Sequence, residues 1–405
     1  MKNLSIEEEL RIIKRGVAEL IPEEELVEKL KRKRARGEPL RIKYGADPSR
    51  PDLHLGHYVC LRKLKELQDL GHHIIFIVGD FTAMIGDPSG RSKTRPQLSR
   101  EEVEENSRTY FEQVFRVLDR EKTEVRYNSE WHEKLTARDI IKLASTYTVA
   151  RMLERDDFEK RFKQEVPISI HEFLYPIFQG YDSYVIASDI EVGGTDQKFN
   201  FLIAREIQKA FGQEPQVILT LPLLEGTDGK LKMSKSYDNY IGLTEPPGEI
   251  YGKVMSIPDE LVPKYFELVL AYDEEKLEEI KSLMKVDPRN TKARLAFEIV
   301  EALHSREEAE KAQREFDRIF RERGIPEEIP EFEVPPGGID IISIIFDAGL
   351  VKSKSEARRL VRQGGVKLDG TPITDEKAVL SLDSEKILKV GKRRFLKLVP
   401  SHKIR

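Results

Sequence analysis

The stretch that decides the fold is Leu40–His57, LRIKYGADPSRPDLHLGH, in which a short apolar segment precedes a proline-rich turn and two histidines. Its first part, Leu40–Ala46, has the composition of a strand, and residues 53–70 show helical spacing. A second apolar run, Ile74–Asp80, is typical of a strand buried in a parallel sheet. This order of elements predicts an α/β domain with ligands at the carboxyl ends of its strands.

The chain divides into four predicted parts. Further strand candidates, separated by helical stretches, extend the α/β pattern into a doubly wound Rossmann-type domain: 124–127, 190–192 and 217–221. We expect this domain, with N-terminal helices and an inserted connective segment, at 1–224, a mostly helical and charged domain at 225–326, an acidic Pro/Gly-rich linker at 327–338 and a small basic α+β module at 339–405.

The composition predicts a soluble protein of the cytoplasm. At 405 residues the chain is long enough for two or three domains, and 39% hydrophobic residues suffice for packed cores. A single cysteine, Cys60, rules out an intramolecular disulfide. No apolar run approaches the roughly 20 residues that span a bilayer, and the acidic N-terminus has no apolar signal segment, so we expect no membrane partner.

The C-terminal segment is basic, unlike the rest of the chain. The net charge is −4, yet residues 340–405 hold 15 Lys and Arg against 8 Asp and Glu, a charge of +7. This distribution predicts that one module binds a polyanion. Within it, Ser353–Gly365 has the pattern of a basic helix, Val366–Gly370 that of a strand and tight turn, and Lys392–Phe395 that of a basic hairpin edge. A generic small basic domain is the alternative.

Two histidines, His54 and His57, stand in the first turn of the helix predicted at 53–70. A helix N-terminus has free N–H groups and a positive dipole, which suit it to phosphate. Gly56 would let a nucleotide approach the backbone closely. A helix that merely contains two histidines is the alternative. A metal site is disfavoured because no Cys/His cluster accompanies the pair.

The segment Lys232–Ser236, KMSKS, lies in a polar loop that contains glycine. Two lysines three residues apart, with hydroxyls beside them, suit a mobile clamp that closes on a polyphosphate. A solvated basic loop is the alternative. The presence of the histidine turn in the same chain favours the phosphate interpretation and predicts an enzyme that uses ATP.

The HLGH and KMSKS elements resemble the two signatures of class I aminoacyl-tRNA synthetases. Three further stretches are similar to the tyrosyl-tRNA synthetases of bacteria: Gly86–Arg91 (GDPSGR), Tyr175–Asp182 (YPIFQGYD) and Gly193–Gln197 (GGTDQ). The resemblance covers nearly the whole chain. It implies that L-tyrosine and Mg²⁺-bound ATP form tyrosyl-adenylate and pyrophosphate, that tyrosine then passes to the 3′ end of tRNA(Tyr), and that the protein is a homodimer without a permanently bound cofactor or metal.

The tyrosine-binding residues form the first group that the resemblance implies. Tyr175, Gln179 and Asp182 are spaced four and three apart, so they share one face of a helix and could hold an amino acid at both ends. An exposed polar face is the alternative. By the resemblance, Asp182 accepts from the phenol hydroxyl. Tyr175, Gln179 and Asp87 bind the α-ammonium, and Gln197 lies near the reacting carboxylate.

The nucleotide-binding residues form the second group. The resemblance implies that six side chains neutralise charge on the phosphates: His54, His57, Arg91, Arg95, Lys232 and Lys235. It places further contacts to ATP at Gly45, Asp47, Ser49, Gly56, Gly193, Gly194, Asp196, Met233, Ser234 and Lys235. Asp196 would hold the ribose hydroxyls, although an N-cap role is compatible with this. Ordinary surface arginines are the alternative for Arg91 and Arg95.

One position departs from the family pattern. Many bacterial relatives have a tyrosine where this chain has Lys43, as a second partner of the substrate hydroxyl. Tyr44 is the neighbour, and alternation along a strand would point its side chain the other way. Asp182 is therefore expected to be the main determinant of specificity.

Three rival functions remain at this point. A tryptophanyl enzyme has a similar fold, but Asp182 suits a phenol and the basic tail also opposes this alternative. A small-molecule nucleotidyltransferase would lack both the helical domain at 225–326 and the tail at 339–405. The resemblance implies that the helical domain binds the anticodon. A catalytically silent paralogue could have lost the lysines or the pocket groups, which are all present. The tail itself resembles the small RNA-binding module named after a ribosomal protein, which would bind tRNA by shape and phosphate.

Overall fold

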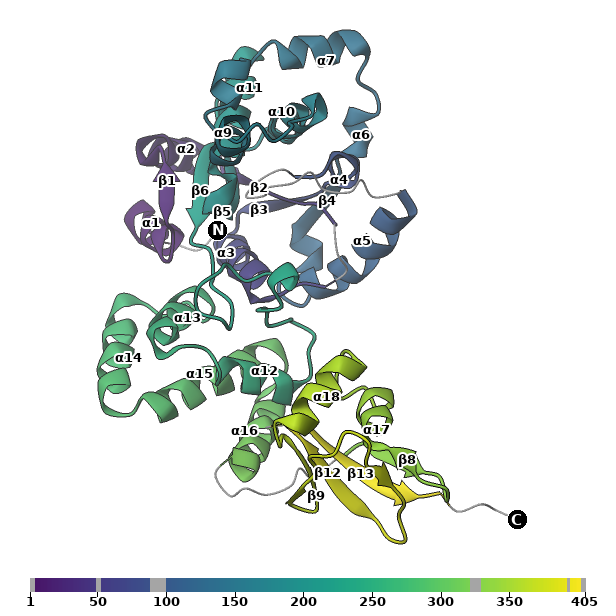
Figure 1. The fold of residues 1–405 in the computed structure, drawn as a ribbon. Helices are drawn as coiled ribbons and strands as arrows, with labels where there is room; N and C mark the ends of the chain where they lie inside the picture. The colour runs from purple at the N-terminus through teal and green to yellow at the C-terminus, as the bar shows by residue number, and fades with distance from the viewer. Residues whose placement is uncertain (1–3, 49–51, 88–99, 321–328, 392–393, 402–405) are drawn as a thin grey trace. The chain divides into compact units, whose positions relative to one another are not determined.

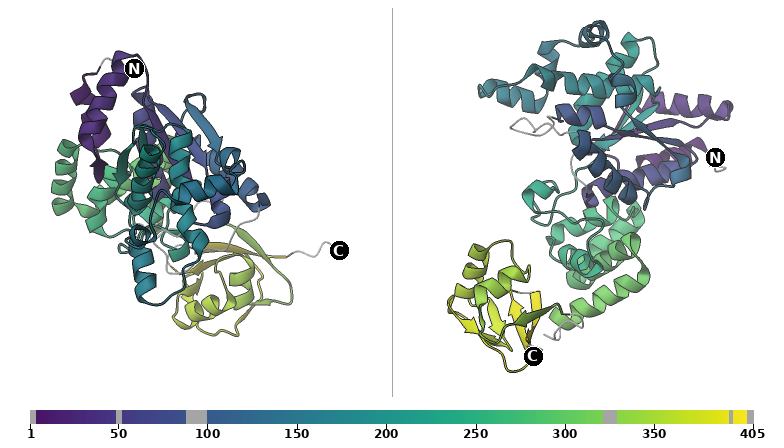
Figure 2. Two further views of the ribbon diagram at one scale, coloured as in Figure 1. Left: turned by 90° about the horizontal axis from the view of Figure 1, so that it is seen from above. Right: turned by 90° about the vertical axis from the view of Figure 1, so that its right-hand side faces the viewer.

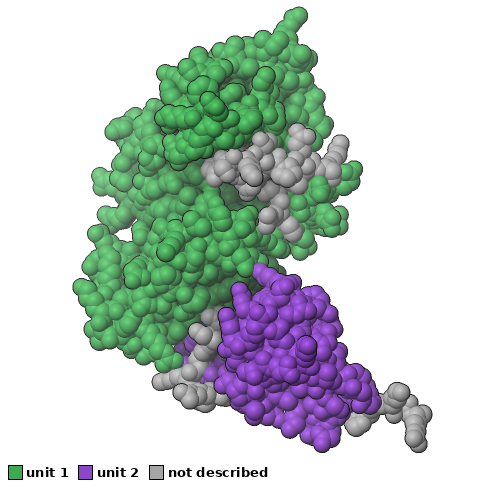
Figure 3. Space-filling model, viewed as in Figure 1, with its two compact units in different colours: residues 1–306 green, residues 307–405 purple. Residues whose placement is uncertain are grey.

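The computed structural model describes residues 4–48, 52–87, 100–320, 329–391 and 394–401 (Figure 1). The chain forms two compact units, residues 1–306 and 307–405, which Figure 3 shows in different colours. Each unit has its own sheet, and each is described separately below.

The first unit is built on a six-stranded sheet whose strand order confirms the predicted doubly wound α/β fold. The order is β1 (Glu19–Ile21), β6 (Val217–Leu221), β5 (Ile190–Gly194), β2 (Arg41–Ala46), β3 (His73–Val78) and β4 (Thr123–Tyr127). All neighbours are parallel except β1, which pairs antiparallel with β6. Five strands lie where the sequence predicts them. β1, which is only three residues long, was not predicted.

Helices cover both faces of this sheet (Figures 1 and 2). On one face, the ring of Phe76 on β3 packs edge-on against Phe111 of α5 (Arg100–Val114), and α3 (Leu55–Asp69) also covers this side. On the other face, Ile75 and Ile77 pack with Ile186. This face is covered by α10 (Ile170–Val185) and α11 (Lys198–Ala210), whose apolar side chains share one buried cluster. Successive residues of β3 thus alternate between two helical layers, as buried parallel strands require.

The remaining helices of the first unit flank this core. They are α1 (Ile6–Lys14), α2 (Glu23–Ala35), α4 (Asp80–Ile85), α6 (Ser129–His132), α7 (Ala137–Ala144), α8 (Val149–Met152) and α9 (Asp156–Lys163). After β6 the chain forms α12 (Pro247–Val254), α13 (Val262–Leu268), α14 (Glu274–Val286) and α15 (Pro288–Leu303), in agreement with the helical character predicted from residue 225 onwards. Short 3-10 turns complete the unit: η1 (Arg120–Lys122), η2 (Thr195–Gln197), η3 (Lys235–Tyr237) and η4 (Asp259–Leu261).

The second unit contains nearly all of α16 (Arg306–Phe320) and a small α+β module. The module packs α17 (Ile341–Asp347) and α18 (Lys354–Arg362) against a five-stranded sheet. The sheet has the order β10 (Thr371–Pro372), β9 (Val366–Leu368), β12 (Lys386–Val390), β13 (Arg394–Pro400) and β7 (Glu331–Val334). A two-stranded sheet joins β11 (Val379–Leu380) to β8 (Ile339–Asp340). The small α+β fold predicted for this end of the chain is confirmed.

The predicted linker needs one correction. Residues 331–334 form β7 and pair in parallel with β13, so this part of 327–338 belongs to the C-terminal sheet. The reason is visible in the sequence EFEV, where Phe332 and Val334 alternate with glutamates and pack on the core of the module. Pro330 directly precedes the strand, and the other Pro and Gly residues of this stretch, 335–338, follow it.

Membrane spans are absent from the described ranges. Within residues 4–48, 52–87, 100–320, 329–391 and 394–401, no helix is both long and apolar enough to cross a bilayer.

Candidate active site

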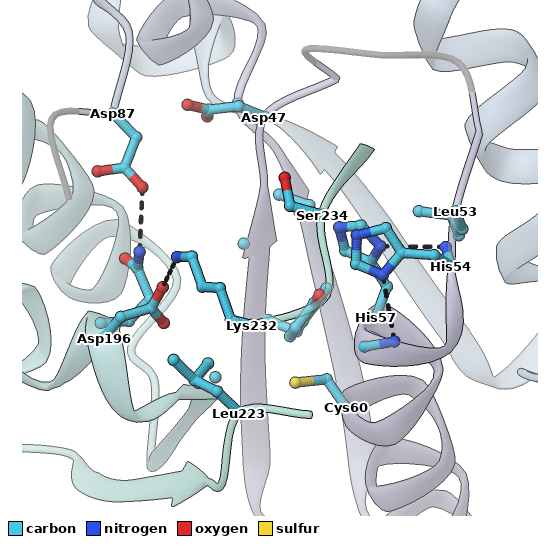
Figure 4. Close-up of a pocket in the computed structure, with 18 of the residues that line it drawn as sticks. Asp47, Leu53, His54, His57, Cys60, Asp87, Asp196, Leu223, Lys232 and Ser234 are labelled. Carbon is cyan, nitrogen blue, oxygen red and sulfur yellow. Dashed lines mark hydrogen bonds and ion pairs between the residues drawn. The ribbon is translucent and has the colours of Figure 1, made fainter. Parts of the chain in front are cut away.

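A cavity of about 560 Å³ lies at the carboxyl ends of β2 and β5 in the first unit (Figure 4). Each predicted site residue that the structure describes lines it: Gly45, Asp47, His54, Gly56, His57, Asp87, Tyr175, Gln179, Asp182, Gly193, Gly194, Asp196, Gln197, Lys232, Met233, Ser234 and Lys235. Ser49, Arg91 and Arg95 lie outside the described residues. The strand ends thus collect residues from five distant segments, as expected for a doubly wound sheet.

The helix α3 begins with a capping box made by two histidines. His54 is the N-cap, and its Nδ1 accepts from the N–H of Gly56 at 3.2 Å. The Nδ1 of His57 accepts in turn from the N–H of His54, also at 3.2 Å (Figure 4). A Cβ at position 56 would lie 3.0 Å from the His54 ring and would press this ring away from its capping position by a few tenths of an ångström. Close approach of a nucleotide to this glycine stays a prediction.

Both histidine rings are neutral at pH 7. Burial lowers the pKa of His54 to about 2. Burial also lowers the pKa of His57 to about 4, and the nearby Lys235 and Lys232 add to this effect. Because each Nδ1 accepts a backbone N–H, the proton of each ring stands on Nε2. The pair can therefore offer two neutral N–H donors to an anion, and it brings no positive charge.

The two lysines of the KMSKS loop are each paired with a carboxylate. The Nζ of Lys232 lies 2.9 Å from Oδ2 of Asp196 (Figure 4), and the Nζ of Lys235 pairs with Asp52. Ser234 lies between the lysines and caps η3 by accepting from the N–H of Ser236. Asp196 is predicted to bind the ribose. Lys232 occupies one of the roughly four acceptor positions of this carboxylate, so ribose hydroxyls can bind beside this ion pair or in its place.

At the other end of the cavity, Tyr175, Gln179 and Asp182 project from one face of α10, as their spacing predicts. The hydroxyl of Tyr175 donates to Oδ2 of Asp47 at 2.8 Å. Asp47 was predicted among the ATP contacts, yet it touches a residue predicted to bind tyrosine. It therefore stands where the two predicted groups of residues meet.

Asp182 is buried and held by three donors that sequence reasoning missed. The Nε1 of Trp131 donates to Oδ1 of Asp182 at 2.8 Å, and the Nε2 of His132 lies 2.7 Å from the same oxygen. The Nδ2 of Asn128 donates to Oδ2 at 3.3 Å. One signal was available, because Trp131 is the only tryptophan of the chain and follows a predicted strand. Three donors on one buried carboxylate hold it in one orientation.

Lys43 lies inside the protein, and it does not line the cavity. Its side chain is 0% exposed, and its Nζ lies 2.8 Å from Oε1 of Glu191, which is 1% exposed. The same ammonium donates to the carbonyl of Gln179 at 2.7 Å and to Oγ of Ser183 at 2.8 Å. Three acceptors match its three N–H groups, so no donor remains for a substrate hydroxyl. Tyr44 lies on the other face of β2, against Phe76, as strand alternation predicts.

The turn after β5 is shaped by its neighbours on α11. A Cβ at Gly193 would lie 2.6 Å from Cζ of Phe201, so the close approach of this ring requires glycine. The turn carries Gln197, whose Nε2 donates to Oδ2 of Asp87 at 3.0 Å (Figure 4). Two residues that were predicted from separate motifs are thus in direct contact.

The second unit presents a basic helix. Ala357 and Val361 of α18 are buried in its core, while the basic side chains of this helix are exposed: Lys354, Arg358, Arg359 and Arg362. The basic helix that the sequence predicts at 353–365 is confirmed over 354–362. Its exposed charges suit the phosphates of a nucleic acid.

Comparison with known proteins agrees with this geometry. A family model described as tRNA synthetases class I (W and Y) matches residues 35–321. A tyrosine–tRNA ligase of Thermotoga maritima is 55% identical over 395 residues, which cover 97% of each chain. The chain belongs to the tyrosyl-tRNA synthetase family. The predicted membership of this family, and with it a tyrosine–tRNA ligase function, is therefore confirmed.

Other relatives support the same assignment. The tyrosine–tRNA ligase of Carboxydothermus hydrogenoformans is 56% identical over 403 residues, covering 97% of this chain and 98% of that one. A tyrosyl-tRNA synthetase of Archaeoglobus fulgidus, solved with L-tyrosine, has a TM-score of 0.63 and 26% identity, and the match covers 76% of this chain and all of that one. A second family model, the S4 domain, matches residues 342–385. These tyrosine-specific relatives set aside the tryptophanyl alternative.

Proposed function

We propose that the cavity of the first unit activates L-tyrosine with Mg²⁺-bound ATP and that the chain then passes tyrosine to the 3′ end of tRNA(Tyr). One observation carries this proposal. The polar face of α10, with a firmly held Asp182, lines the same cavity as the histidine cap of α3 and the lysines of the KMSKS loop. A site for a phenol and a site for phosphates are therefore contiguous.

At the tyrosine end, Asp182 accepts a hydrogen bond from the phenol hydroxyl. Its three protein donors leave room for one more, because a carboxylate has about four acceptor positions. Tyr175, Gln179 and Asp87 bind the α-ammonium. Gln197 lies near the reacting carboxylate. A buried site of this kind rejects an amino acid without the hydroxyl, since Asp182 would then lack one partner.

At the nucleotide end, the neutral Nε2–H groups of His54 and His57 donate to phosphate oxygens. Lys232 and Lys235 leave their present carboxylate partners and bind the polyphosphate, and Asp196, once free of Lys232, binds the ribose. We extend the same role to Arg91 and Arg95, which lie outside the described residues. The remaining predicted contacts to ATP line the same cavity: Gly45, Asp47, Gly56, Gly193, Gly194, Met233 and Ser234. Ser49, also outside the described residues, is proposed with them.

The first step is an in-line displacement. The tyrosine carboxylate forms a bond to the α-phosphorus, the bond to the bridging oxygen breaks, and pyrophosphate leaves. No side chain needs to act as nucleophile or base, so the protein works by alignment and by neutralising charge on the phosphates. The magnesium ion arrives with ATP as part of the substrate.

For the second step we propose that residues 225–326 hold the anticodon region of tRNA and that the module at 339–405 binds its phosphates. The exposed basic face of α18 supports the latter role. We also propose a homodimer in the cytoplasm, as the family resemblance implies. The division into a catalytic part at 1–224, a helical domain at 225–326 and a C-terminal module at 339–405 remains our proposal, with residues 331–334 added to the C-terminal module.

The direct test is ATP–pyrophosphate exchange with tyrosine, tryptophan and phenylalanine in parallel. We expect rapid exchange with tyrosine alone. Exchange with tryptophan alone, or with none of the three, would overturn the proposal. Charging of tRNA(Tyr) by the full chain, compared with the chain ending at residue 330, tests the role of the C-terminal module, because this truncation also removes β7 of its sheet.

A further inference from the structure

A single buried amide lies behind the tyrosine end of the cavity. Asn200 of α11 is 0% exposed and does not line the cavity. Its Nδ2 donates to Oε1 of Gln179 at 2.9 Å and to Oε1 of Gln197 at 3.0 Å. One amide nitrogen therefore bridges the two glutamines to which the proposed function gives contacts with the substrate.

The groups that contact the other side of Asn200 determine which of its amide atoms faces the glutamines. The NH1 group of Arg155 lies 3.2 Å from Oδ1 of Asn200, and a guanidinium can only donate. The oxygen of the Asn200 amide must therefore face Arg155, and its NH₂ group must face the glutamines. Arg155 itself is buried and pairs with both oxygens of Asp157 at 2.6 and 2.7 Å, which fixes its orientation.

The contacts of the two glutamine Nε2 atoms agree with this direction. The Nε2 of Gln197 donates to Oδ2 of Asp87 at 3.0 Å, and the Nε2 of Gln179 lies 3.4 Å from Oε1 of Glu191. A carboxylate only accepts, so each glutamine nitrogen must point towards it. Glu191 is itself paired with the buried Lys43, whose Nζ lies 2.8 Å from its Oε1. A donor at one end of the network and carboxylates at the other leave one consistent arrangement of the three amides.

We propose that Asn200, oriented by Arg155, is a positioning residue that sets the polarity of the amino acid site. The Nδ2 of Asn200 contacts the carbonyl oxygens of both glutamines and so fixes which way each amide faces. Gln179 then offers its carbonyl oxygen to the α-ammonium, and Gln197 keeps an N–H for the α-carboxylate. Rotation of both amides by half a turn would place donors against the ammonium and an acceptor against the carboxylate. The inference rests on the proposed function, and it adds the reason why this site takes a zwitterion in one orientation.

Replacement of Asn200 by aspartate tests this role, because the shape is kept while the donor becomes an acceptor. We expect Asn200→Asp to raise KM for tyrosine in pyrophosphate exchange by roughly 10- to 100-fold and to leave KM for ATP within about twofold. Asn200→Ala removes the donor without adding an acceptor, so its KM for tyrosine should rise less. A packing role predicts the reverse order, since alanine leaves a cavity and aspartate does not.

Gln208 provides a matched control on the same helix. It is equally buried, and its Nε2 also bridges several acceptors, the carbonyl of Ser188 and Oε1 of Gln213 among them, but it does not line the cavity. Gln208→Glu should lower thermal stability while KM for tyrosine stays within about twofold of that of the parent chain.

The KM values of the Asn200 variants decide between the two roles. A larger rise in KM for tyrosine with aspartate than with alanine, beside an unchanged KM for ATP, supports the proposal. Equal rises in both KM values, or a larger effect of alanine, would overturn it. If Asn200→Asp does not fold, Asn200→Ala alone must raise KM for tyrosine by at least about fivefold, and a smaller rise would overturn the proposal. Exchange by the parent chain with tyrosine separates all these results from a failure of the proposed function itself.

Discussion

The two ends of the cavity differ in how their polar groups are held. At the tyrosine end, Asp182 is 3% exposed and has three protein donors, and Asn200, which bridges Gln179 and Gln197, is fully buried. At the nucleotide end, Lys232 and Lys235 project from a loop, and their ion pairs are partly exposed: the side chains are 39% and 25% exposed for Lys232 and Asp196, and 14% and 53% for Lys235 and Asp52. The hydrogen bonds of the tyrosine end are complete before the substrate arrives. The lysines of the nucleotide end have to exchange their carboxylate partners for phosphates.

This difference follows from burial. A charge inside the protein must have its partners built in, because an unpaired buried charge costs several kcal/mol. An exposed ion pair contributes only about 0 to 1 kcal/mol, so it can break without much loss. The tyrosine end is therefore suited to selection of a substrate, and the nucleotide end is suited to a movement that accompanies binding of ATP.

The largest effect is expected at the preformed end. Asp182→Asn places an amide against donors that need a carboxylate, and loss of a buried charged partner costs about 3 to 5 kcal/mol. We expect kcat/KM for tyrosine in pyrophosphate exchange to fall by roughly 150- to 5,000-fold, and the preference for tyrosine over phenylalanine to narrow. A fall of less than about tenfold would show that Asp182 does not select the substrate.

The next effect is expected in the loop. Lys235→Ala removes a positive charge that stabilises the phosphates in the transition state, so kcat for activation should fall by roughly 100-fold in stopped-flow measurements. Lys230→Ala is the matched control, because Lys230 is an exposed lysine of the same loop that does not line the cavity. If both variants slow activation equally, general loss of charge is the cause and not the position of Lys235.

The histidine cap predicts a dependence of stability on pH. In the folded protein burial keeps the pKa of His57 at about 4, below the 6.5 of an exposed ring. Its contribution to stability is therefore complete above pH 6.5 and is lost as the pH falls towards 4. Between pH 7.5 and 5 this one group should lower the free energy of unfolding by about 2 kcal/mol, and His57→Gln should remove that part of the loss.

Urea unfolding followed by fluorescence measures this effect in the right part of the molecule, because the only tryptophan, Trp131, lies buried in the first unit. Burial lowers the pKa of His54 to about 2. In the His57→Gln variant, His54 should therefore still cause a comparable dependence of the free energy of unfolding on pH. A variant with the same pH dependence as the parent chain would show that His57 is not kept neutral by the fold.

The smallest effect is expected from the exposed partner of the loop. Asp52→Asn frees Lys235 from its present ion pair, so KM for ATP should fall, though by no more than about fivefold. Initial rates of pyrophosphate exchange at varied ATP measure this. A rise in KM for ATP would show that Asp52 contributes to ATP binding itself.

Much of the fold could be predicted because local patterns specify it. Apolar runs marked five of the six strands of the large sheet, and regular spacing marked α3 and α18. The short strand β1 was missed because three residues carry no clear period. β7 was missed because prolines and glycines follow it directly, so its alternating sequence was assigned to a linker.

The site was predictable in part for a related reason. Residues in compact motifs, such as His54 and Lys235, could be found from the sequence. Their supporting partners could not, because contacts such as those from Trp131 to Asp182 or from Asn200 to Gln179 depend on the tertiary fold. Lys43 shows the same limit, since only the structure reveals that Glu191 is its partner.

The central claim, a preformed tyrosine end beside a nucleotide end that rearranges, is tested most directly by tyrosine affinity without ATP. Equilibrium dialysis with labelled tyrosine should compare the parent chain, Asp182→Asn and Lys235→Ala. We expect the parent chain to bind tyrosine alone, Lys235→Ala to bind it within about twofold as well, and Asp182→Asn to bind it at least about 100-fold more weakly. Equal losses in the two variants, or no binding by the parent chain without ATP, would contradict the account.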